Sequence, residues 1–204
     1  GSNDAPTVAG QIAMDIKVSN TSSGTFLIEA FDTSSTIGNL GTADAIIANN
    51  SVAASFSRST INLSDGAQGR FLGTERFPGG LTETFVIKAT GSFSVDTAGT
   101  YTIFSRTDDG HRIEIDGTTI LSDNRNHAAE DFFTPVTLAA GSHDLEVVFW
   151  ENGGGAELEI GIASGSVSSF SSSAFSLLTT ANSQAIDLNL LSGVVDADKT
   201  TSLS

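Results

Sequence analysis

Short segments in which apolar residues recur at every second position run through most of the chain, and no other feature constrains its fold as strongly. Phe85, Ile87 and Ala89 follow this rule. A period of two is that of a β-strand, whose successive side chains point to opposite faces. Turn-forming dipeptides, such as Asp-Gly at 116–117, separate the segments. The pattern predicts an all-β protein with the architecture of an antiparallel β-sandwich.

Elements of this sandwich can be placed along the chain. Strands are predicted within residues 11–19, 25–31, 54–63, 81–95, 101–106, 111–116, 118–121, 133–138, 144–150 and 156–162. One short helix is predicted at residues 42–48, with Thr42 as its N-cap. Residues 64–80 and 122–131 are polar and irregular, and we expect them to be long binding loops carried by the β scaffold.

The charge balance restricts the possible partners. Lys and Arg number 9 against 24 Asp and Glu, which gives a net charge of −15. Nucleic-acid binding needs clustered Lys and Arg against phosphate, so a nucleic-acid partner is not expected. The densest apolar run, residues 147–150, is much shorter than a membrane span, so direct membrane insertion is not expected either. An acidic chain of this kind suits divalent cations.

Oxygen-rich motifs end two of the predicted strands. Thr-Asp-Asp-Gly occupies residues 107–110, and Trp-Glu-Asn-Gly-Gly-Gly occupies residues 150–155. Carboxylates, a side-chain amide and backbone carbonyls are the oxygen ligands that Ca²⁺ takes in proteins. We therefore expect the two loops to meet around one Ca²⁺. For Asp-Asp-Gly taken alone, a plain hairpin turn is the simpler interpretation, because Asp and Gly are favoured turn residues.

The order of these motifs resembles the protective-antigen fourteen-kilodalton domain family, a β-sandwich of bacterial toxins, glycosidases and adhesins. The likeness covers roughly residues 43–163. It rests on two stretches. Within residues 101–117, a predicted strand is followed by Thr-Asp-Asp-Gly, a second strand and Ile-Asp-Gly. Within residues 139–160, Ala-Gly-Ser-His is followed by a predicted strand, Glu-Asn-Gly-Gly-Gly-Ala and Leu-Glu-Ile. The flanks, residues 3–6 and 188–204, resemble the seams between cadherin-like repeats of bacterial repeats-in-toxin adhesins.

The lectin branch of that family, as in yeast flocculins and bacterial adhesins, holds calcium with two aspartates joined by a cis peptide, and the ion binds neighbouring sugar hydroxyls. The resemblance implies that Asp108 and Asp109 are this pair and that Asn152 supplies the amide ligand. It also implies backbone carbonyl ligands at Gly154 and Ala156. The residues expected to contact carbohydrate are Asp108, Asp109, His111, Gly153, Gly154 and Gly155.

Aromatic and histidine side chains near these motifs have plainer interpretations. Trp150 is expected to be a core residue rather than a platform for a sugar ring. The three histidines do not have the spacing of a zinc site and are each expected at the surface, although His111 lies beside the aspartates and is a candidate ligand contact: His111, His127 and His143.

The resemblance implies a calcium-dependent carbohydrate-binding module of a bacterial surface adhesin, with Ca²⁺ as cofactor and cell-surface glycans or monosaccharides as partners. Residues 1–10 are expected to be linker and cloning scar, 11–185 the lectin domain, and 186–204 its last strand or the start of a following cadherin-like repeat. A monomeric, extracellular, non-enzymatic module within a longer chain is expected. Two alternatives stay open: a calcium-stabilised structural or protein-binding spacer, and an accessory domain of a glycoside hydrolase.

Overall fold

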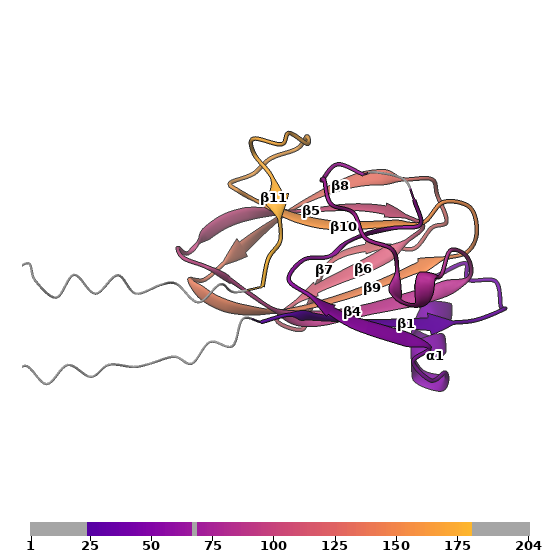
Figure 1. Cartoon of the computed structure of the whole chain (residues 1–204). Coiled ribbons are helices and arrows are strands. Elements are labelled where there is room, and N and C mark those ends of the chain that lie inside the picture. The colour runs from indigo at the N-terminus through magenta and orange to yellow at the C-terminus, as the bar shows by residue number, and fades with distance from the viewer. Residues whose placement is uncertain (1–23, 67–68, 181–204) are drawn as a thin grey trace, which may run out of the picture.

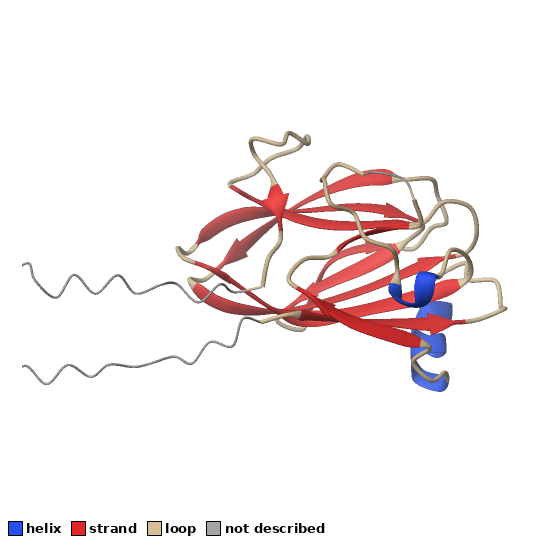
Figure 2. Ribbon diagram, in the orientation of Figure 1, coloured by secondary structure: helices blue, strands red, loops and turns tan. Residues whose placement is uncertain are grey.

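Strands account for most of the computed structural model, which describes residues 24–66 and 69–180 (Figures 1 and 2). They are β1 (Phe26–Asp32), β2 (Ala54–Arg58), β3 (Asn62–Ser64), β4 (Phe85–Val95), β5 (Gly99–Asp108), β6 (His111–Ile115), β7 (Thr118–Asp123), β8 (Glu130–Leu138), β9 (Gly141–Glu151), β10 (Glu157–Ser164) and β11 (Ser176–Leu177). The expected linker at 1–10, the strand at 11–19 and the tail at 186–204 lie outside the described residues.

Two antiparallel sheets face each other (Figure 1). The six-stranded sheet has the order β2-β1-β4-β9-β6-β7, and the five-stranded sheet has the order β11-β10-β5-β8, with β3 paired to β10. The predicted antiparallel β-sandwich is therefore confirmed. None of the helices in the described part of the chain is long and apolar enough to cross a membrane.

Successive side chains of β9 point to opposite faces of the sheet and belong to two separate hydrophobic cores. Val147 and Phe149 point between the sheets and join the main core, whereas Val148 and Trp150 point to the other face of the six-stranded sheet. There they pack beneath α1 (Leu40–Asn49), which covers that face at one end of the sandwich (Figure 2). Trp150 has 0% of its surface exposed, which confirms its prediction as a core residue.

The helix begins earlier than its sequence pattern suggested. Asn39 is the N-cap, and its side-chain oxygen accepts a hydrogen bond from the backbone N–H of Thr42 at 2.9 Å. The prediction of Thr42 as N-cap is therefore wrong, because Thr42 lies inside the first turn. Within the described residues α1 is the one α-helix, and η1 (Pro78–Gly80) is a single 3₁₀ turn.

Residues 54–63, predicted as one strand, form two. β2 pairs with β1 in the six-stranded sheet, whereas β3 pairs with β10 in the five-stranded sheet. The chain crosses from one layer to the other between them, and a continuous pattern of alternation does not reveal such a crossing. The predicted Asp116-Gly117 turn is confirmed: both residues have positive φ, 51° and 72°, as a two-residue hairpin loop requires.

Candidate metal centre

Three connections cross between the two sheets at one end of the sandwich. β5 leads to β6, β7 leads to β8, and β9 leads to β10. Strand register brings their ends together, because Asp108 pairs with Glu157 while His111 pairs with both Asp123 and Phe149. The two oxygen-rich motifs thus lie at the same end, and residues 124–129 form a third loop beside them. Figure 1 shows α1 at this end and the two ends of the described chain at the other.

Carboxylates from two of these connections gather at one point. Asp108, Asp109 and Glu151 each contribute a carboxylate oxygen, and these oxygens all lie within 4.8 Å of one another. A cis peptide joins Asp108 to Asp109, as the resemblance implied.

Asp109 is held by both flanking loops. Its Oδ1 accepts the backbone N–H of His127 at 2.8 Å, and its Oδ2 accepts the backbone N–H of Asn152 at 2.9 Å. The residue is 5% exposed, so these bonds replace most of its hydration. The two loops are therefore positioned by the carboxylate at the centre of the cluster.

The cluster lacks a compensating positive charge. Burial, and next the charge of the neighbouring Asp109, raise the pKa of Asp108 to about 6. Burial likewise raises the pKa of Glu151 to about 8, with the charge of Asp109 the next cause. Among the described residues, no Lys, Arg or His side chain forms an ion pair with these three acids. Three acids that repel one another, two of them buried, form an oxygen set that fits a divalent cation.

Asn152 and Ala156, both expected as ligands, already accept one hydrogen bond each. Oδ1 of Asn152 accepts the backbone N–H of Ile37 at 2.8 Å, and the carbonyl oxygen of Ala156 accepts the N–H of Asp65 at 3.1 Å. A carbonyl oxygen has two lone pairs, so each retains one for an ion. These bonds also tie residues 37 and 65 to the centre.

The glycine run forms the wall next to Asp108. Gly153 and Gly154 have φ of 150° and 116°, a backbone region that residues with a Cβ rarely adopt. A Cβ at Gly155 would lie 3.8 Å from Oδ2 of Asp108, so this backbone passes close to the carboxylate. The expected ligand Gly154 thus belongs to a loop beside the acids, although no contact identifies its carbonyl as a ligand.

His111 does not face the site. It has 0% exposed surface, and its ring nitrogens hydrogen-bond Ser105 at 2.8 Å and Thr107 at 3.0 Å. Burial lowers the pKa of His111 to about 3, so the ring is neutral. The prediction that His111 contacts carbohydrate is wrong, because the ring lies between the sheets beneath the carboxylates. His127 and His143 are also mostly buried, with 9% and 8% of their side chains exposed, which corrects their expected surface position.

Glu151 is the residue that sequence reasoning missed. Its strand places Leu145, Val147 and Phe149 in the main core at every second position, and Glu151 continues this row. A carboxylate at the end of an inward-facing apolar row was the available signal.

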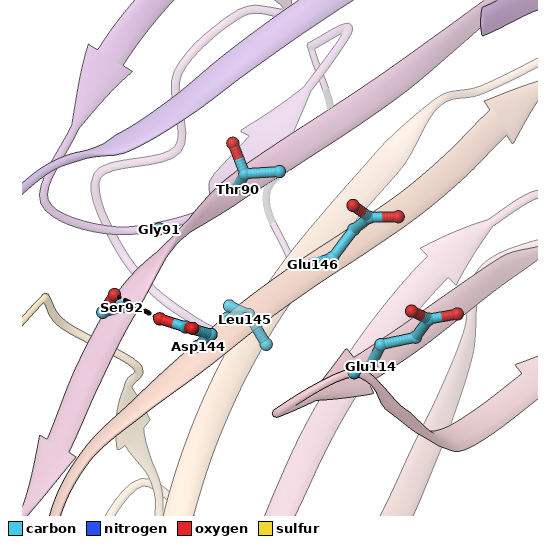
Figure 3. Close-up of a pocket in the computed structure, with 8 residues that line it drawn as sticks. Thr90, Gly91, Ser92, Glu114, Asp144, Leu145 and Glu146 are labelled. Carbon is cyan, nitrogen blue, oxygen red and sulfur yellow. Dashed lines mark hydrogen bonds between the residues drawn. The ribbon is translucent and has the colours of Figure 1, made fainter. Parts of the chain in front are cut away.

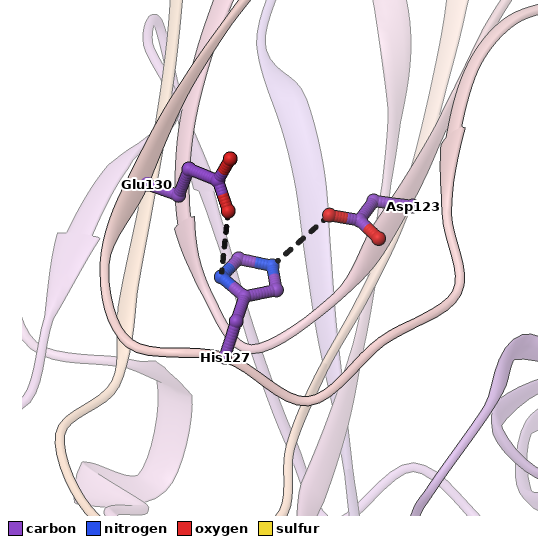
Figure 4. A group of neighbouring side chains, drawn as sticks. All are labelled: Asp123, His127 and Glu130. Carbon is purple, nitrogen blue, oxygen red and sulfur yellow. Dashed lines mark ion pairs between the residues drawn. The ribbon is translucent and has the colours of Figure 1, made fainter.

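A second acidic group lies in the β7–β8 connection. Asp123, His127 and Glu130 approach one another (Figure 4), with 3.3 Å between Nε2 of His127 and Oδ2 of Asp123. The guanidinium of Arg125 already supplies the cation here, since it bonds both oxygens of Asp123 at 2.8 and 2.6 Å and reaches Glu130 at 3.2 Å. This group fixes the loop that carries the His127 amide toward Asp109.

A hollow of about 380 Å³ opens on the outer face of the six-stranded sheet (Figure 3). Its carboxylates have local partners: Asp144 accepts from the Ser92 hydroxyl at 2.9 Å, and Glu146 pairs with Lys88 at 3.0 Å. Unlike the acids at Asp108 and Asp109, both glutamates that line the hollow, Glu114 and Glu146, have ion-pair partners, so the hollow is not the candidate site.

Comparison with known proteins bears on this centre. The family model of the PA14 domain matches residues 75–169. Among solved structures, the PA14 sugar-binding domain from an RTX adhesin is 25% identical, with 78% of this chain and 99% of that chain covered and a TM-score of 0.58. The PA14 domain of the MpAFP antifreeze protein is 21% identical, with 76% and 90% covered and a TM-score of 0.58.

A yeast adhesin shares the fold at lower identity. The epithelial adhesin 9 A domain from Candida glabrata, solved in complex with Galβ1-3GlcNAc, is 9% identical, with 76% of this chain and 89% of that chain covered and a TM-score of 0.53. No curated protein matches the sequence. The sandwich extends beyond the matched residues, because β1 pairs with β4 and β3 pairs with β10. Residues 75–169 therefore match the PA14 domain, the family that the paired aspartates and the glycine loop resemble.

Proposed function

We propose that this domain is a calcium-dependent carbohydrate-binding module of a bacterial surface adhesin. The observation that carries the proposal is the cluster of Asp108, Asp109 and Glu151, three acids within 4.8 Å of one another and without an ion-pair partner among the described residues. Asp108 and Asp109 hold the ion, and Asn152 adds its amide oxygen. A bound Ca²⁺ with open coordination positions accepts two neighbouring hydroxyl oxygens of a sugar.

The surrounding loops orient the ligand. Residues 153–155 leave the space beside Asp108 free of side chains, so a sugar ring can approach the backbone there. Residues 124–129 and the loop that follows β3 form the other sides. Their hydrogen bonds to Asp109 and Ala156 fix them relative to the acids. Sugar selectivity is therefore expected to depend on these loops rather than on the sandwich.

Similarity to known adhesins supports the wider context. The solved relative at 25% identity is a sugar-binding domain from an RTX adhesin, and the Candida glabrata relative was solved with a disaccharide. The first of these likenesses supports the proposed position at a bacterial surface, and both are compatible with a non-catalytic module of a longer chain. The expected domain at 11–185 and the expected cadherin-like start at 186–204 remain part of this proposal.

Thermal unfolding tests the proposal directly. The protein is melted with EDTA, with Ca²⁺, and with Ca²⁺ plus individual monosaccharides, because a ligand that binds only the folded state raises the melting temperature. We expect a rise with Ca²⁺ and a further, sugar-selective rise. Asp108→Asn should show neither rise in melting temperature. Asp144→Asn, which removes one negative charge from β9 away from the site, should show both rises. Full calcium-dependent sugar binding by Asp108→Asn would refute the site.

The two alternatives give different results in the same assay. A calcium-stabilised spacer or protein-binding module shows the rise with Ca²⁺ and none with any sugar. An accessory domain of a glycoside hydrolase binds the sugars of one polysaccharide class, so a panel of oligosaccharides distinguishes it from an adhesin lectin. The domain itself should turn over none of them, because two aspartates that share one ion cannot flank a scissile bond.

A further inference from the structure

Glu151 is a buried carboxylate with half of its hydrogen-bonding capacity unused. It has 0% exposed surface, and its Oε1 accepts the backbone N–H of Gly153. Its Oε2 is buried and has no hydrogen-bond partner within residues 24–66 and 69–180. Buried polar atoms are almost always paired, so an orphan carboxylate oxygen requires an explanation.

A purely structural role does not account for this oxygen. Holding the Gly153 amide requires one acceptor, which the neutral side chain of Gln supplies equally well. The second oxygen lies in a cluster whose other members, Asp108 and Asp109, are also acids. Burying a carboxylate beside two others is unfavourable unless a cation compensates them.

The direction of the side chain also points to an ion. Glu151 continues the inward-facing row of Val147 and Phe149, so it approaches the acids from the core between the sheets. Asp108 and Asp109 approach from the β5–β6 connection. The three side chains therefore converge from different strands onto one position, which is how a coordination sphere is built.

We propose that Glu151 is a direct ligand of the ion and closes its coordination sphere on the core side. This inference rests on the proposed function, because it concerns the same ion. Three carboxylates around one Ca²⁺ leave a net charge of −1 at the centre. The open positions then all face the solvent between the loops, where sugar hydroxyls can reach them.

The test uses Glu151→Gln, which keeps an acceptor for the Gly153 amide and removes the orphan oxygen. Glu146→Gln is the matched control, since it removes the same charge from the same strand, on the outer face. Binding of Ca²⁺ is measured by calorimetry. Binding of Tb³⁺ is measured by luminescence, sensitised by the single tryptophan, Trp150, whose ring lies against Gly110 next to Asp109. Lifetimes in H₂O and D₂O count the waters on the bound Tb³⁺.

We expect Glu151→Gln to bind Ca²⁺ at least tenfold more weakly than the parent, with at least one additional water on Tb³⁺, and Glu146→Gln to match the parent. In EDTA, Glu151→Gln should melt at or above the parent, because Gln keeps the acceptor for the Gly153 amide and cannot add a third negative charge to the cluster. Parent-like affinity and hydration, or a variant that does not fold in EDTA, would overturn the inference. If Asp108→Asn no longer binds Ca²⁺ while Glu151→Gln binds it as the parent does, only the assignment of Glu151 is wrong. If the parent protein binds no Ca²⁺, the proposed function itself is wrong.

Discussion

Gly110 lies between the acidic cluster and the core beneath α1, and it packs directly against Trp150 of that core. A Cβ at this position would lie 2.3 Å from the Trp150 ring and 2.6 Å from the carbonyl oxygen of Arg125. The Trp150 amide donates to the Gly110 carbonyl at 3.2 Å, and its indole N–H donates to Oδ1 of Asn126 at 2.9 Å. Trp150 therefore supports the site from behind, although it cannot touch a ligand.

Gly110→Ala is expected to destabilise the protein, because the added methyl group must displace a fully buried ring and a backbone carbonyl. Overpacking of this kind costs about 1–3 kcal/mol of the free energy of unfolding. Urea denaturation in EDTA measures it without contribution from the ion. Gly99→Ala, at the start of β5, is the control, since its Cβ would meet nothing within 4 Å. Equal stability of the two variants would contradict this account.

At the scale of elements, Glu159 anchors the loop that follows β3. It lies on β10 with 0% exposed surface, and its carboxylate accepts the backbone N–H groups of Arg70 at 2.8 Å and Phe71 at 3.0 Å. Arg70 in turn pairs with Asp131 at 2.7 Å, which links this loop to β8. The position of a polar loop is thus set by a buried acid on a strand of the five-stranded sheet.

Glu159→Gln should loosen this loop, because the new amide group faces a backbone N–H that then has no acceptor. An unpaired buried donor costs about 1–3 kcal/mol. We expect a lower free energy of unfolding and faster proteolytic cleavage near residues 69–71. Glu146→Gln, on the exposed face of β9, should change neither. A cleavage rate equal to that of the parent would show that the anchor is not needed.

The β6–β7 turn is joined to β9 by a pair that depends on pH. Nδ1 of His143 lies 2.7 Å from Oδ2 of Asp116. The hydrogen bond with Asp116 raises the pKa of His143 above 6.5, and the same contact lowers the pKa of Asp116 below 3.8. The histidine contribution is complete below pH 6.5 and is lost as pH rises through its folded pKa. The aspartate contribution is present above 3.8 and is lost as pH falls.

Asp116→Asn should therefore lower the melting temperature most between pH 4 and pH 6.5, the range bounded by the two ordinary pKa values of 3.8 and 6.5. The difference from the parent should shrink as pH rises through the folded pKa of His143. Melting in EDTA keeps the metal centre out of the comparison, and Asn tolerates the positive φ of this turn. A difference that does not vary with pH would exclude the ion pair as its cause.

At the scale of the whole molecule, the proposed ion site lies where two sheets are joined by three connections, so removal of the ion should weaken the entire sandwich. At an ion concentration of 100 times Kd, binding adds about 2.7 kcal/mol to the free energy of unfolding. For a domain of this size that corresponds to roughly 5–10 °C in melting temperature. Calorimetric melting with Ca²⁺ and with EDTA measures the shift, and Mg²⁺ serves as a control ion with stricter geometry.

Hydrogen exchange should show where the ion acts. The amides of His127 and Asn152 donate to Asp109, so Ca²⁺ is expected to slow their exchange. The Gly165 amide donates to the Thr100 carbonyl, across strand ends remote from the centre, and should change little. A uniform slowing over both ends would instead indicate a general gain in stability.

Local sequence determined the strands, the turns and the acids themselves. Alternation placed β4, β5, β6 and β9, and Asp116-Gly117 fixed a hairpin, because side-chain direction and turn conformation depend on neighbouring residues. The resemblance carried by Asp108-Asp109 and the glycine loop identified the family. These features are encoded within short stretches and need no knowledge of the fold.

Only the tertiary structure decided which residues share the centre. Register and the three crossings between sheets placed Glu151 with Asp108 and Asp109, and the same packing buried His111 beneath them. The split of residues 54–63 between two sheets has the same origin. Contacts between distant segments depend on strand order and layer, and a local pattern cannot specify either, since an inward-facing row looks the same in each sheet.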